Sequence, residues 1–397
     1  MTVFDAQSSY ILSAKRTAMG GFQGALSTVP ATELGACAIA AAVAEAGIDK
    51  NSIDEVFMGS VLQAGLKQAP ARQAMIAAGL NQATGATTIN KVCGSGMKSV
   101  MLANDLIKAG SIDVAVSGGM ESMSLAPYIL EKARAGLRMG HSSLKDHMFL
   151  DGLEDWKTAD AMGCFAQSMS ETYQFSREQM DEFAIHSLKR AQQAIEKGFF
   201  TREIVPVGVQ TRKGTVQVTV DEQPGSVSVE KIPTLKPAFK KDGTVTAANS
   251  SSISDGASAL VIASGRYLQG KNLKPLARIV AHATHSRSPA EFTIAPVGSI
   301  EKVLSRAAWK VADVDLFEIN EAFAMVVMAA MHDLKLDHQK VNVNGGACAL
   351  GHPLGSSGSR IIVTLIHELH RRGLKKGIAS LCIGGGEATA IAIEVLG

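Results

Sequence analysis

The chain has 397 residues, of which 46% are hydrophobic and 19% are charged, so it can bury a large core and form more than one domain. Basic and acidic residues nearly balance, at 39 against 37, which argues against a nucleic-acid-binding surface. The five cysteines match no zinc or disulfide spacing, the N-terminus lacks the regions of a signal peptide, and no apolar run is long enough to span a membrane. We expect a cytoplasmic protein without a metal site.

Helical and strand patterns alternate in the N-terminal part of the chain. The sequence predicts a helix over 33–46, a strand over 55–58, a helix over 97–109 and a strand over 114–117. Strands that alternate with helices form sheets covered by helices.

Cys93 lies on a glycine-rich turn, NKVCGSGM at residues 90–97, just before the second predicted helix. Free backbone N–H groups and the positive end of a helix dipole stabilise a thiolate at such a position. We therefore expect the pKa of Cys93 to lie below the usual thiol value of about 8.5, and the residue to act as a nucleophile.

The segment 122–246 has a different pattern. Ser176 and Gln179 form a predicted capping box that opens a helix ending near residue 197, and short strands are expected at 216–220 and 227–229. We interpret the segment as an inserted subdomain that covers an active site. The alternative is a solvent-facing insertion without function.

The C-terminal part repeats the order of helices and strands predicted for the N-terminal part. Helices are expected over 299–308 and 359–371, and strands over 316–319 and 379–383. Similar stretches around residues 54 and 315, 95 and 357, and 121 and 387 recur in the same order at nearly constant separation, which indicates an internal duplication.

Three residues of the C-terminal part are candidates for chemistry. Asn320 follows a strand and could either cap a helix beginning at Glu321 or hold a water or substrate oxygen. His352 stands between glycine and proline before a helix, so it could take a proton from Cys93, although a lone histidine is more often structural. Cys382 precedes the glycines 384–386, so it could be a second acid/base thiol rather than a small buried residue.

The polar loop around Ser251, residues 246–257, is expected to be either a linker or a loop that binds a polar ligand.

Taken together, four motifs resemble those of the thiolase family. They occur in the family's order: Cys93 in VCGSG, Asn320 in NEAFA, His352 in GGACALGHP and Cys382 in CIGGG. The segments 15–18, 120–123 and 249–257 also resemble thiolase segments, so the resemblance covers essentially the whole chain.

The resemblance implies an α/β fold, a layered αβαβα sandwich of two duplicated βαβαβαββ halves with an inserted loop domain. It implies an N-terminal half at 1–121 and 247–273, a loop domain covering the active site at 122–246, and a C-terminal half at 274–397. It also implies a homotetramer arranged as a dimer of dimers.

The same resemblance assigns roles to the motif residues. The acyl group would rest on Cys93, which His352 would activate. Cys382 would remove an α-proton in synthesis, or protonate the carbanion in cleavage. The amides of Cys93 and Gly384 would form one oxyanion hole, and His352 with a water held by Asn320 would form the other.

Coenzyme A thioesters are the implied substrates, with no separate cofactor. The residues expected to contact coenzyme A are Ser251, Met162, Ala247, Ala322, Phe323 and Phe292. The sequence departs from the commonest family pattern near these contacts, at Ala161, Ser252, Ser254, Phe292, Cys348 and Glu387.

The implied activity is that of an acetyl-CoA C-acetyltransferase, which condenses two acetyl-CoA reversibly to acetoacetyl-CoA and CoA. The nearest alternative is a degradative 3-ketoacyl-CoA thiolase that prefers longer chains. A ketoacyl synthase would not need the NEAFA asparagine and Cys382. A non-catalytic acyl-CoA-binding protein would not need the reactive set, and a cysteine hydrolase would not need Cys382.

Overall fold

The structure, a computed structural model, describes residues 4–396. Its first part contains β1 (Ser9–Thr17), β2 (Gly20–Gly21), α1 (Ala31–Ala46), β3 (Glu55–Gly59), α2 (Pro70–Ala77), β4 (Gly85–Ile89), α3 (Ser95–Ala109) and β5 (Val114–Ser122). Strand β3 pairs in parallel with both β4 and β5. Helices α1 and α3 and strands β3 and β5 were predicted from the sequence, with α1 and α3 each beginning two residues early, whereas β1, β2, α2 and β4 were not predicted.

The middle of the chain contains shorter strands and two long helices. They are β6 (Tyr128–Ile129), β7 (Lys145–Asp146), α4 (Met162–Thr172), α5 (Arg177–Glu196), β8 (Ile204–Val205), β9 (Val207–Thr211), β10 (Gly214–Val218) and α6 (Gln223–Ser226). The predicted capping box is present, since Gln179 N donates to Ser176 Oγ at 3.2 Å and Ser176 N donates to Gln179 Oε1 at 2.9 Å.

The last part contains β11 (Ser254–Ser264), α7 (Gly265–Leu268), β12 (Ala277–Ser286), α8 (Ala295–Ala307), β13 (Leu316–Ile319), α9 (Ala324–Leu334), α10 (Ala347–Leu350), α11 (Leu354–Arg372), β14 (Lys376–Ile383) and β15 (Glu387–Val395). Strand β13 pairs in parallel with β14, as β3 does with β5. The duplicated rhythm predicted from the sequence is therefore present in the structure.

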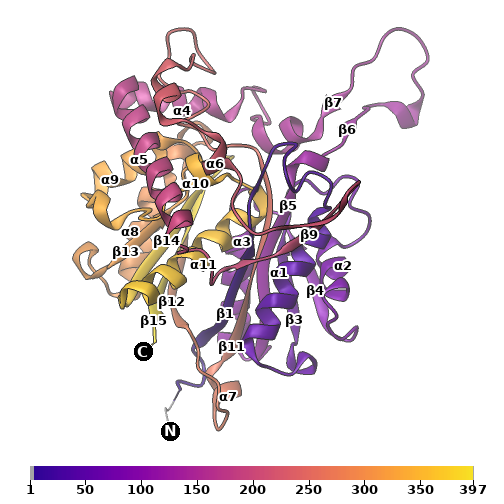
Figure 1. Ribbon diagram of the computed structural model, residues 1–397, viewed down its shortest axis with the longest axis vertical. Coiled ribbons are helices and arrows are strands. Elements are labelled where there is room, and N and C mark those ends of the chain that lie inside the picture. The colour runs from indigo at the N-terminus through magenta and orange to yellow at the C-terminus, as the bar shows by residue number, and fades with distance from the viewer. Residues whose placement is uncertain (1–3, 397) are drawn as a thin grey trace.

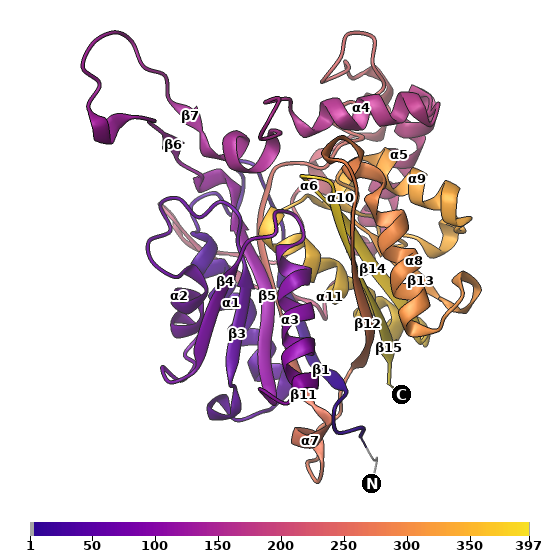
Figure 2. The same ribbon diagram turned by 180° about the vertical axis from the view of Figure 1, so that it is seen from behind.

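The strands follow one path, β13–β14–β15–β12–β1–β11–β5–β3–β4, with β2 attached to β11 and β8 to β1. Strand β1 pairs with β11 along its length but with β12 only at Ser9–Ile11. The sheet therefore opens at β1 into two halves, which lie side by side in Figures 1 and 2.

Helices cover both halves and fill the space between them. Helices α1 and α2 pack on the outer face of the first half, and α8 and α9 on the outer face of the second. The central cluster joins α3 and α11 to strands of both halves, through residues such as Met97, Val100 and Ile362. The predicted αβαβα layering is thereby confirmed.

The two central helices approach closely near their N-termini. A Cβ on Gly358 would lie 2.4 Å from Met97 N, and one on Gly96 would lie 2.6 Å from Ser359 Oγ. Because a side chain at either position would collide with the other helix, these glycines allow the contact. The residues just before α3 and α11 are consequently brought close together.

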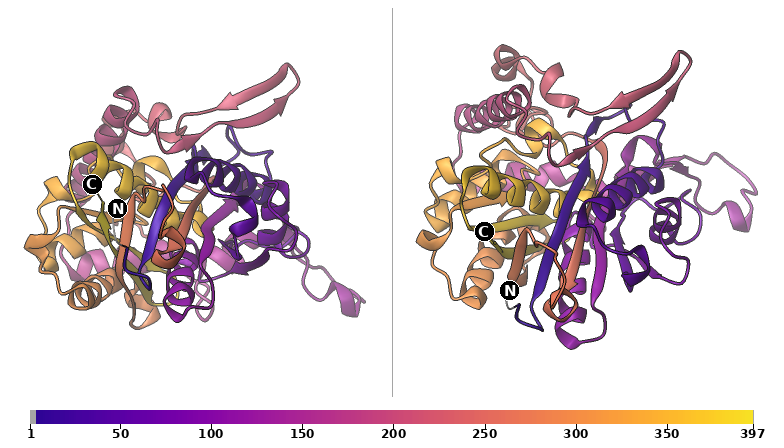
Figure 3. Two further views of the ribbon diagram at one scale, coloured as in Figure 1. Left: turned by 90° about the horizontal axis from the view of Figure 1, so that it is seen from below. Right: turned by 60° about the horizontal axis from the view of Figure 1, so that its bottom comes forward.

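Elements of the middle segment lie above the sheet and beside it. Helices α4 and α5 are above the C-terminal half in Figure 1, and the arm carrying β6 and β7 projects from the N-terminal half. The β9–β10 hairpin reaches toward the N-terminal half in Figure 3, where Val207 and Val209 join the core under α1.

Several predicted boundaries were wrong. Helix α11 begins five residues early, because packing against α3 stabilises a glycine- and serine-rich turn of low helix propensity. Helix α8 begins at Ala295 rather than at residue 299. Residues 227–229 do not form a strand, since no neighbouring strand pairs with them. Within 4–396, no helix is long and apolar enough to cross a bilayer.

Candidate active site

Cys93 lies on the turn between β4 and α3, and hydrogen bonds on both sides hold the turn. Val92 N donates to Asn90 Oδ1 at 2.9 Å, Lys91 N donates to Ser95 Oγ at 2.8 Å, and Ser95 Oγ donates to Val92 O at 2.6 Å. Val92 adopts a φ of 47°, which costs roughly 1–3 kcal/mol for a β-branched residue. The surrounding bonds therefore hold Cys93 next to a residue with a strained backbone, Val92.

Burial raises the pKa of Cys93 to about 11. The N–H groups of Gly384 and of Cys93 itself bond to the sulfur and lower the pKa, but they offset only part of the desolvation, and the charge of Glu121 raises the pKa further. The expectation of a lowered pKa was wrong. The position at a helix N-terminus was predicted correctly, but desolvation outweighs it.

His352 precedes α11 and is held in one orientation by a serine of that helix. Its Nδ1 lies 2.5 Å from Ser357 Oγ, which itself donates to Pro353 O at 3.0 Å. Because the single hydroxyl hydrogen is used on the carbonyl, Nδ1 carries the imidazole hydrogen and Nε2 keeps a free lone pair. Burial, aided by the charge of Arg360, lowers the pKa of His352 to about 3, so the ring is neutral. Nε2 has no partner among the described residues.

Cys382 ends β14 and is fully buried. Burial, and secondly the charge of Cys93, raise the pKa of Cys382 well above its usual value, which requires the two sulfurs to be near one another. Gly384 follows on the next turn and donates its N–H to the Cys93 sulfur. The fold thus brings residues 93 and 382–384 together from separate halves.

Asn320 lies at the end of β13, where its N–H donates to Ser380 O on the strand that carries Cys382, at 3.0 Å. The predicted capping role was wrong, since α9 begins at Ala324 and Phe323 is its N-cap residue. The Asn320 side chain is 1% exposed, and neither of its polar atoms has a partner within residues 4–396. A buried amide of this kind requires a water or ligand partner, which favours the second of the two predicted roles.

One cavity of about 370 Å³ connects these residues to the segment above the sheet. Cys93, His352 and Gly384 lie in its wall, whereas Cys382 and Asn320 do not line it; Cys382 packs against the wall residues Phe292 and Phe323. All six residues expected to contact coenzyme A line the cavity: Ser251, Met162, Ala247, Ala322, Phe323 and Phe292.

Comparison of the sequence with models of known protein families shows which family the chain belongs to. The thiolase N-terminal domain matches residues 9–266, and the thiolase C-terminal domain matches residues 273–395. The chain belongs to the thiolase family.

Relatives of this thiolase match it over nearly the full length. It is 50% identical to the acetyl-CoA acetyltransferase of Escherichia coli (strain K12), over 97% of this chain and 98% of the relative. The crystal structure of the Bacillus anthracis acetyl-CoA acetyltransferase superposes with a TM-score of 0.96 at 42% identity, covering 98% and 99% of the two chains. The Acat5 thiolase of Ascaris suum, solved in complex with coenzyme A, gives 0.93 at 41% identity, covering 98% and 100%.

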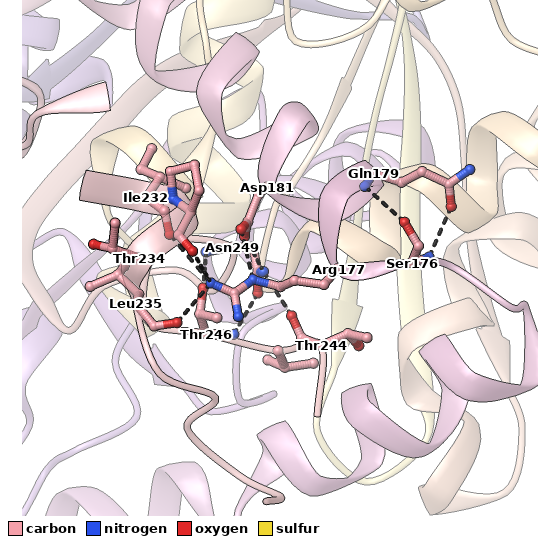
Figure 4. A network of polar contacts seen from close by, with 12 residues as sticks. Ser176, Arg177, Gln179, Asp181, Ile232, Thr234, Leu235, Thr244, Thr246 and Asn249 are labelled. Atoms are coloured by element: carbon pink, nitrogen blue, oxygen red, sulfur yellow. Dashed lines mark hydrogen bonds and ion pairs between the residues drawn. The ribbon is translucent and has the colours of Figure 1, made fainter. Parts of the chain in front are cut away.

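The polar loop of this thiolase is held by a network that begins on α5 (Figure 4). Asp181 accepts from Arg177 Nε at 2.7 Å and from Asn249 Nδ2 at 3.0 Å. Arg177 also donates to Leu235 O at 2.7 Å, and Thr246 N donates to Asn249 Oδ1 at 2.8 Å. Helix α5 therefore positions residues 246–252, which form one wall of the cavity.

A second cavity, of about 340 Å³, adjoins the first and shares Ala247 and Ser252 with it. It is lined by residues of the middle segment, including Lys231, and by Cys348. Arg212 and Lys213 are exposed on the turn between β9 and β10 and line neither cavity.

Two residues that the sequence analysis did not single out help to build this thiolase site. Ser357 orients His352. The sequence signal that could have identified Ser357 was its position one turn into the helix that follows His352. Glu121 accepts from Val61 N, Leu62 N and Gly355 N at 3.0, 3.1 and 2.8 Å, so it links β5 to the start of α11. Nothing in the sequence around Glu121 indicated these partners.

Proposed function

We propose that this thiolase is an acetyl-CoA C-acetyltransferase that works through an acyl-Cys93 intermediate. The observation that carries the proposal is the convergence of Cys93, His352 and Gly384 on one apolar cavity, with Cys382 close behind them. The names of the full-length relatives support the same activity.

In the first half-reaction the Cys93 sulfur attacks the thioester carbonyl of acetyl-CoA. His352 Nε2 accepts the thiol proton and passes it to the departing CoA sulfur, which leaves as a thiol. Because the thiol is weakly acidic and the imidazole weakly basic in this site, the proton moves as the new bond forms. The N–H groups of Cys93 and Gly384 would stabilise the oxyanion.

In the second half-reaction the Cys382 thiol gives its proton to His352 Nε2, and the resulting thiolate takes an α-proton from a second acetyl-CoA. Its raised pKa makes this thiolate a strong base, which the weakly acidic α-carbon requires. The carbanion attacks the acyl carbonyl, the bond to Cys93 breaks, and protonated His352 returns its proton to the Cys93 sulfur as acetoacetyl-CoA is released. A water held by Asn320, together with His352, would stabilise the enolate oxygen.

Coenzyme A would extend from Cys93 through the first cavity toward the second, past Ala247 and Ser251. Lys231 would then lie nearer to its phosphates than Arg212 does. The proposal includes the division of the chain into an N-terminal half at 1–121 and 247–273, a loop domain at 122–246 and a C-terminal half at 274–397. It also includes a homotetramer and a cytoplasmic location, where the two thiols would remain reduced.

A short acyl chain fits the cavity better than a long one. The ring centroid of Phe323 is 6.2 Å from that of Phe239 and 6.5 Å from that of Phe292. Phe292 and Phe323 are also buried beside Cys382 in one cluster, and both line the cavity that contains Cys93. This crowding favours acetyl transfer over the degradative, longer-chain activity.

Steady-state kinetics across a series of 3-ketoacyl-CoAs, with mass spectrometry of the trapped intermediate, test the proposal. The expected results are an acetyl group on Cys93 and the highest kcat/KM for acetoacetyl-CoA. Rising efficiency with chain length would favour the degradative thiolase. Release of free acetate would indicate a hydrolase, and binding without turnover would indicate a binding protein.

A further inference from the structure

Two turns from opposite halves of the molecule meet at Cys93. The nucleophile turn, residues 90–95, comes from the first half, and the glycine turn, residues 383–387, comes from the second. The backbone N–H of Gly384 lies near enough to the Cys93 sulfur to lower its pKa, and a Cβ on Gly384 would lie 3.8 Å from Val92 Cγ1. A Cβ on Gly94 would lie 2.3 Å from Ile383 Cδ1, so the turns are also in direct van der Waals contact.

An ion pair joins the same two turns at their outer side. Lys91 Nζ contacts Glu387 Oε2, and the two side chains are only 20% and 33% exposed. Ser286 Oγ donates to the other oxygen of Glu387 at 3.3 Å. Lys91 is two residues before Cys93 and Glu387 is three residues after Gly384, so the pair spans the place where the sulfur meets the amide.

Each turn is held by bonds of its own. In the glycine turn, Gly385 and Gly386 adopt φ values of 94° and 98°. Arg287 N donates to Gly386 O at 2.7 Å, and Gly386 N donates to Ile383 O at 3.3 Å. The nucleophile turn has the hydrogen bonds described above. None of these bonds joins one turn to the other, so the relative position of the two turns depends on the contacts between them.

We propose that the Lys91–Glu387 ion pair is a positioning device that holds the Gly384 N–H against the reacting atoms of Cys93. The inference rests on the proposed acetyl transfer, because the N–H that bonds the free sulfur would also face the oxygen of acyl-Cys93. A partly exposed ion pair adds little to stability. Its effect on rate is larger, because small displacements of an oxyanion donor are costly.

The test compares Glu387→Gln with Glu394→Gln. The control residue lies at the other end of β15, where it pairs with Arg278 at 2.7 Å and is similarly exposed, at 28%. We expect Glu387→Gln to lower kcat about tenfold with little change in KM, since the misplaced donor weakens transition-state binding only. Glu394→Gln should leave kcat within about twofold of the parent.

A double-mutant cycle that combines Glu387→Gln with Lys91→Gln measures the effect of the interaction apart from the effects of the two single substitutions. If the two residues act as one device, the double variant should be no slower than either single variant. Additive losses, an unchanged kcat in Glu387→Gln, or an equal loss in Glu394→Gln would each overturn the proposal.

Alkylation of Cys93 by iodoacetamide provides a readout that does not depend on acetyl transfer. Loosening the Gly384 bond to the sulfur should slow alkylation of Cys93 about threefold in Glu387→Gln at a fixed pH, because that N–H favours the thiolate. If the parent enzyme failed to transfer acetyl groups, the proposed function would fall, while alkylation would still test the positioning role. An alkylation rate equal to that of the parent would refute that role.

Discussion

Cys93 and His352 are both neutral near pH 7, because burial raises the pKa of the thiol to about 11 and lowers that of the imidazole to about 3. In the proposed reaction, charge therefore develops on these residues only during the chemical steps. A site of this kind avoids a standing buried charge and stabilises charge where the transition state needs it.

The first residue-scale prediction concerns the reactivity of Cys93. Its alkylation rate by iodoacetamide should keep rising about tenfold per pH unit from pH 7 to pH 9.5, because only the thiolate reacts. Acetyl-CoA should protect Cys93 but not Cys37, which is partly exposed on the outer helix α1. Peptide mass spectrometry measures both rates. A plateau near pH 8 would contradict the raised pKa.

The second residue-scale prediction concerns Ser357 as a positioning residue for His352. Ser357→Ala should slow acylation about tenfold with little change in KM, because the buried Nδ1–H loses its acceptor and the ring can turn. Ser357→Thr, which keeps the hydroxyl, should restore most of the rate. Ser299→Ala is a matched control, since Ser299 Oγ also donates to a proline carbonyl, Pro296 O, at 3.0 Å. Equal losses in both alanine variants would mean that Ser357 is only structural.

At the scale of elements, the site depends on where chain segments end. Cys93 and His352 precede the two central helices, and Asn320 and Cys382 end two neighbouring strands. Since α3 and α11 meet at their N-terminal turns, these four ends gather at one place. The remaining wall, residues 246–252, is positioned by α5 (Figure 4).

Asp181 should therefore control substrate binding from outside the cavity. Asp181→Asn should raise KM for acetyl-CoA about tenfold, because it removes the carboxylate that accepts from both Arg177 and Asn249. Ser176→Ala on the same helix should cost about 1 kcal/mol of stability through its lost cap, without changing KM. Equal effects of the two variants on KM would contradict the positioning role of the network.

At the scale of the whole molecule, buried carboxyl groups lie between the packed layers. Burial raises the pKa of Glu121 to about 7, and that of Glu318 to about 8 despite the opposing charge of Arg360. Each group holds a proton in the folded state at pH values where the unfolded chain has lost it. The free energy of unfolding therefore falls as pH rises from the usual carboxyl pKa toward 7–8.

Urea unfolding should reveal this dependence between pH 6.5 and pH 8. Histidines with a lowered pKa, such as His338 and His352, give an opposing slope near pH 6.5, because they are partly charged in the unfolded chain and neutral in the folded protein. We expect the two carboxyl groups to contribute a loss of about 2 kcal/mol across this window. Glu318→Gln, which keeps the neutral form, should remove more than half of that contribution, and the difference between the variant and the parent cancels the effect of the histidines. A pH dependence that is the same in Glu318→Gln and in the parent would show that this carboxyl group is not protonated in the folded protein.

The sequence by itself determined part of the fold and the candidate residues for the chemistry. Hydrophobic periodicity located the repeated helix–strand order of both halves but not β1, β11, β12 or β15, and the four motifs located the candidate reactive residues, because both signals are local in the chain. Helix starts were less predictable, as at α11, where packing against α3 overrides the low helix propensity of its first turn.

Only the tertiary structure decided the protonation states and the partners of the reactive residues. The pKa of Cys93 depends on desolvation by both halves, and the roles of Ser357, Glu121 and the Lys91–Glu387 pair depend on contacts. Burial and most of these contacts arise between residues far apart in the chain. A local pattern can therefore name a nucleophile, but it cannot give the environment that sets the nucleophile's charge.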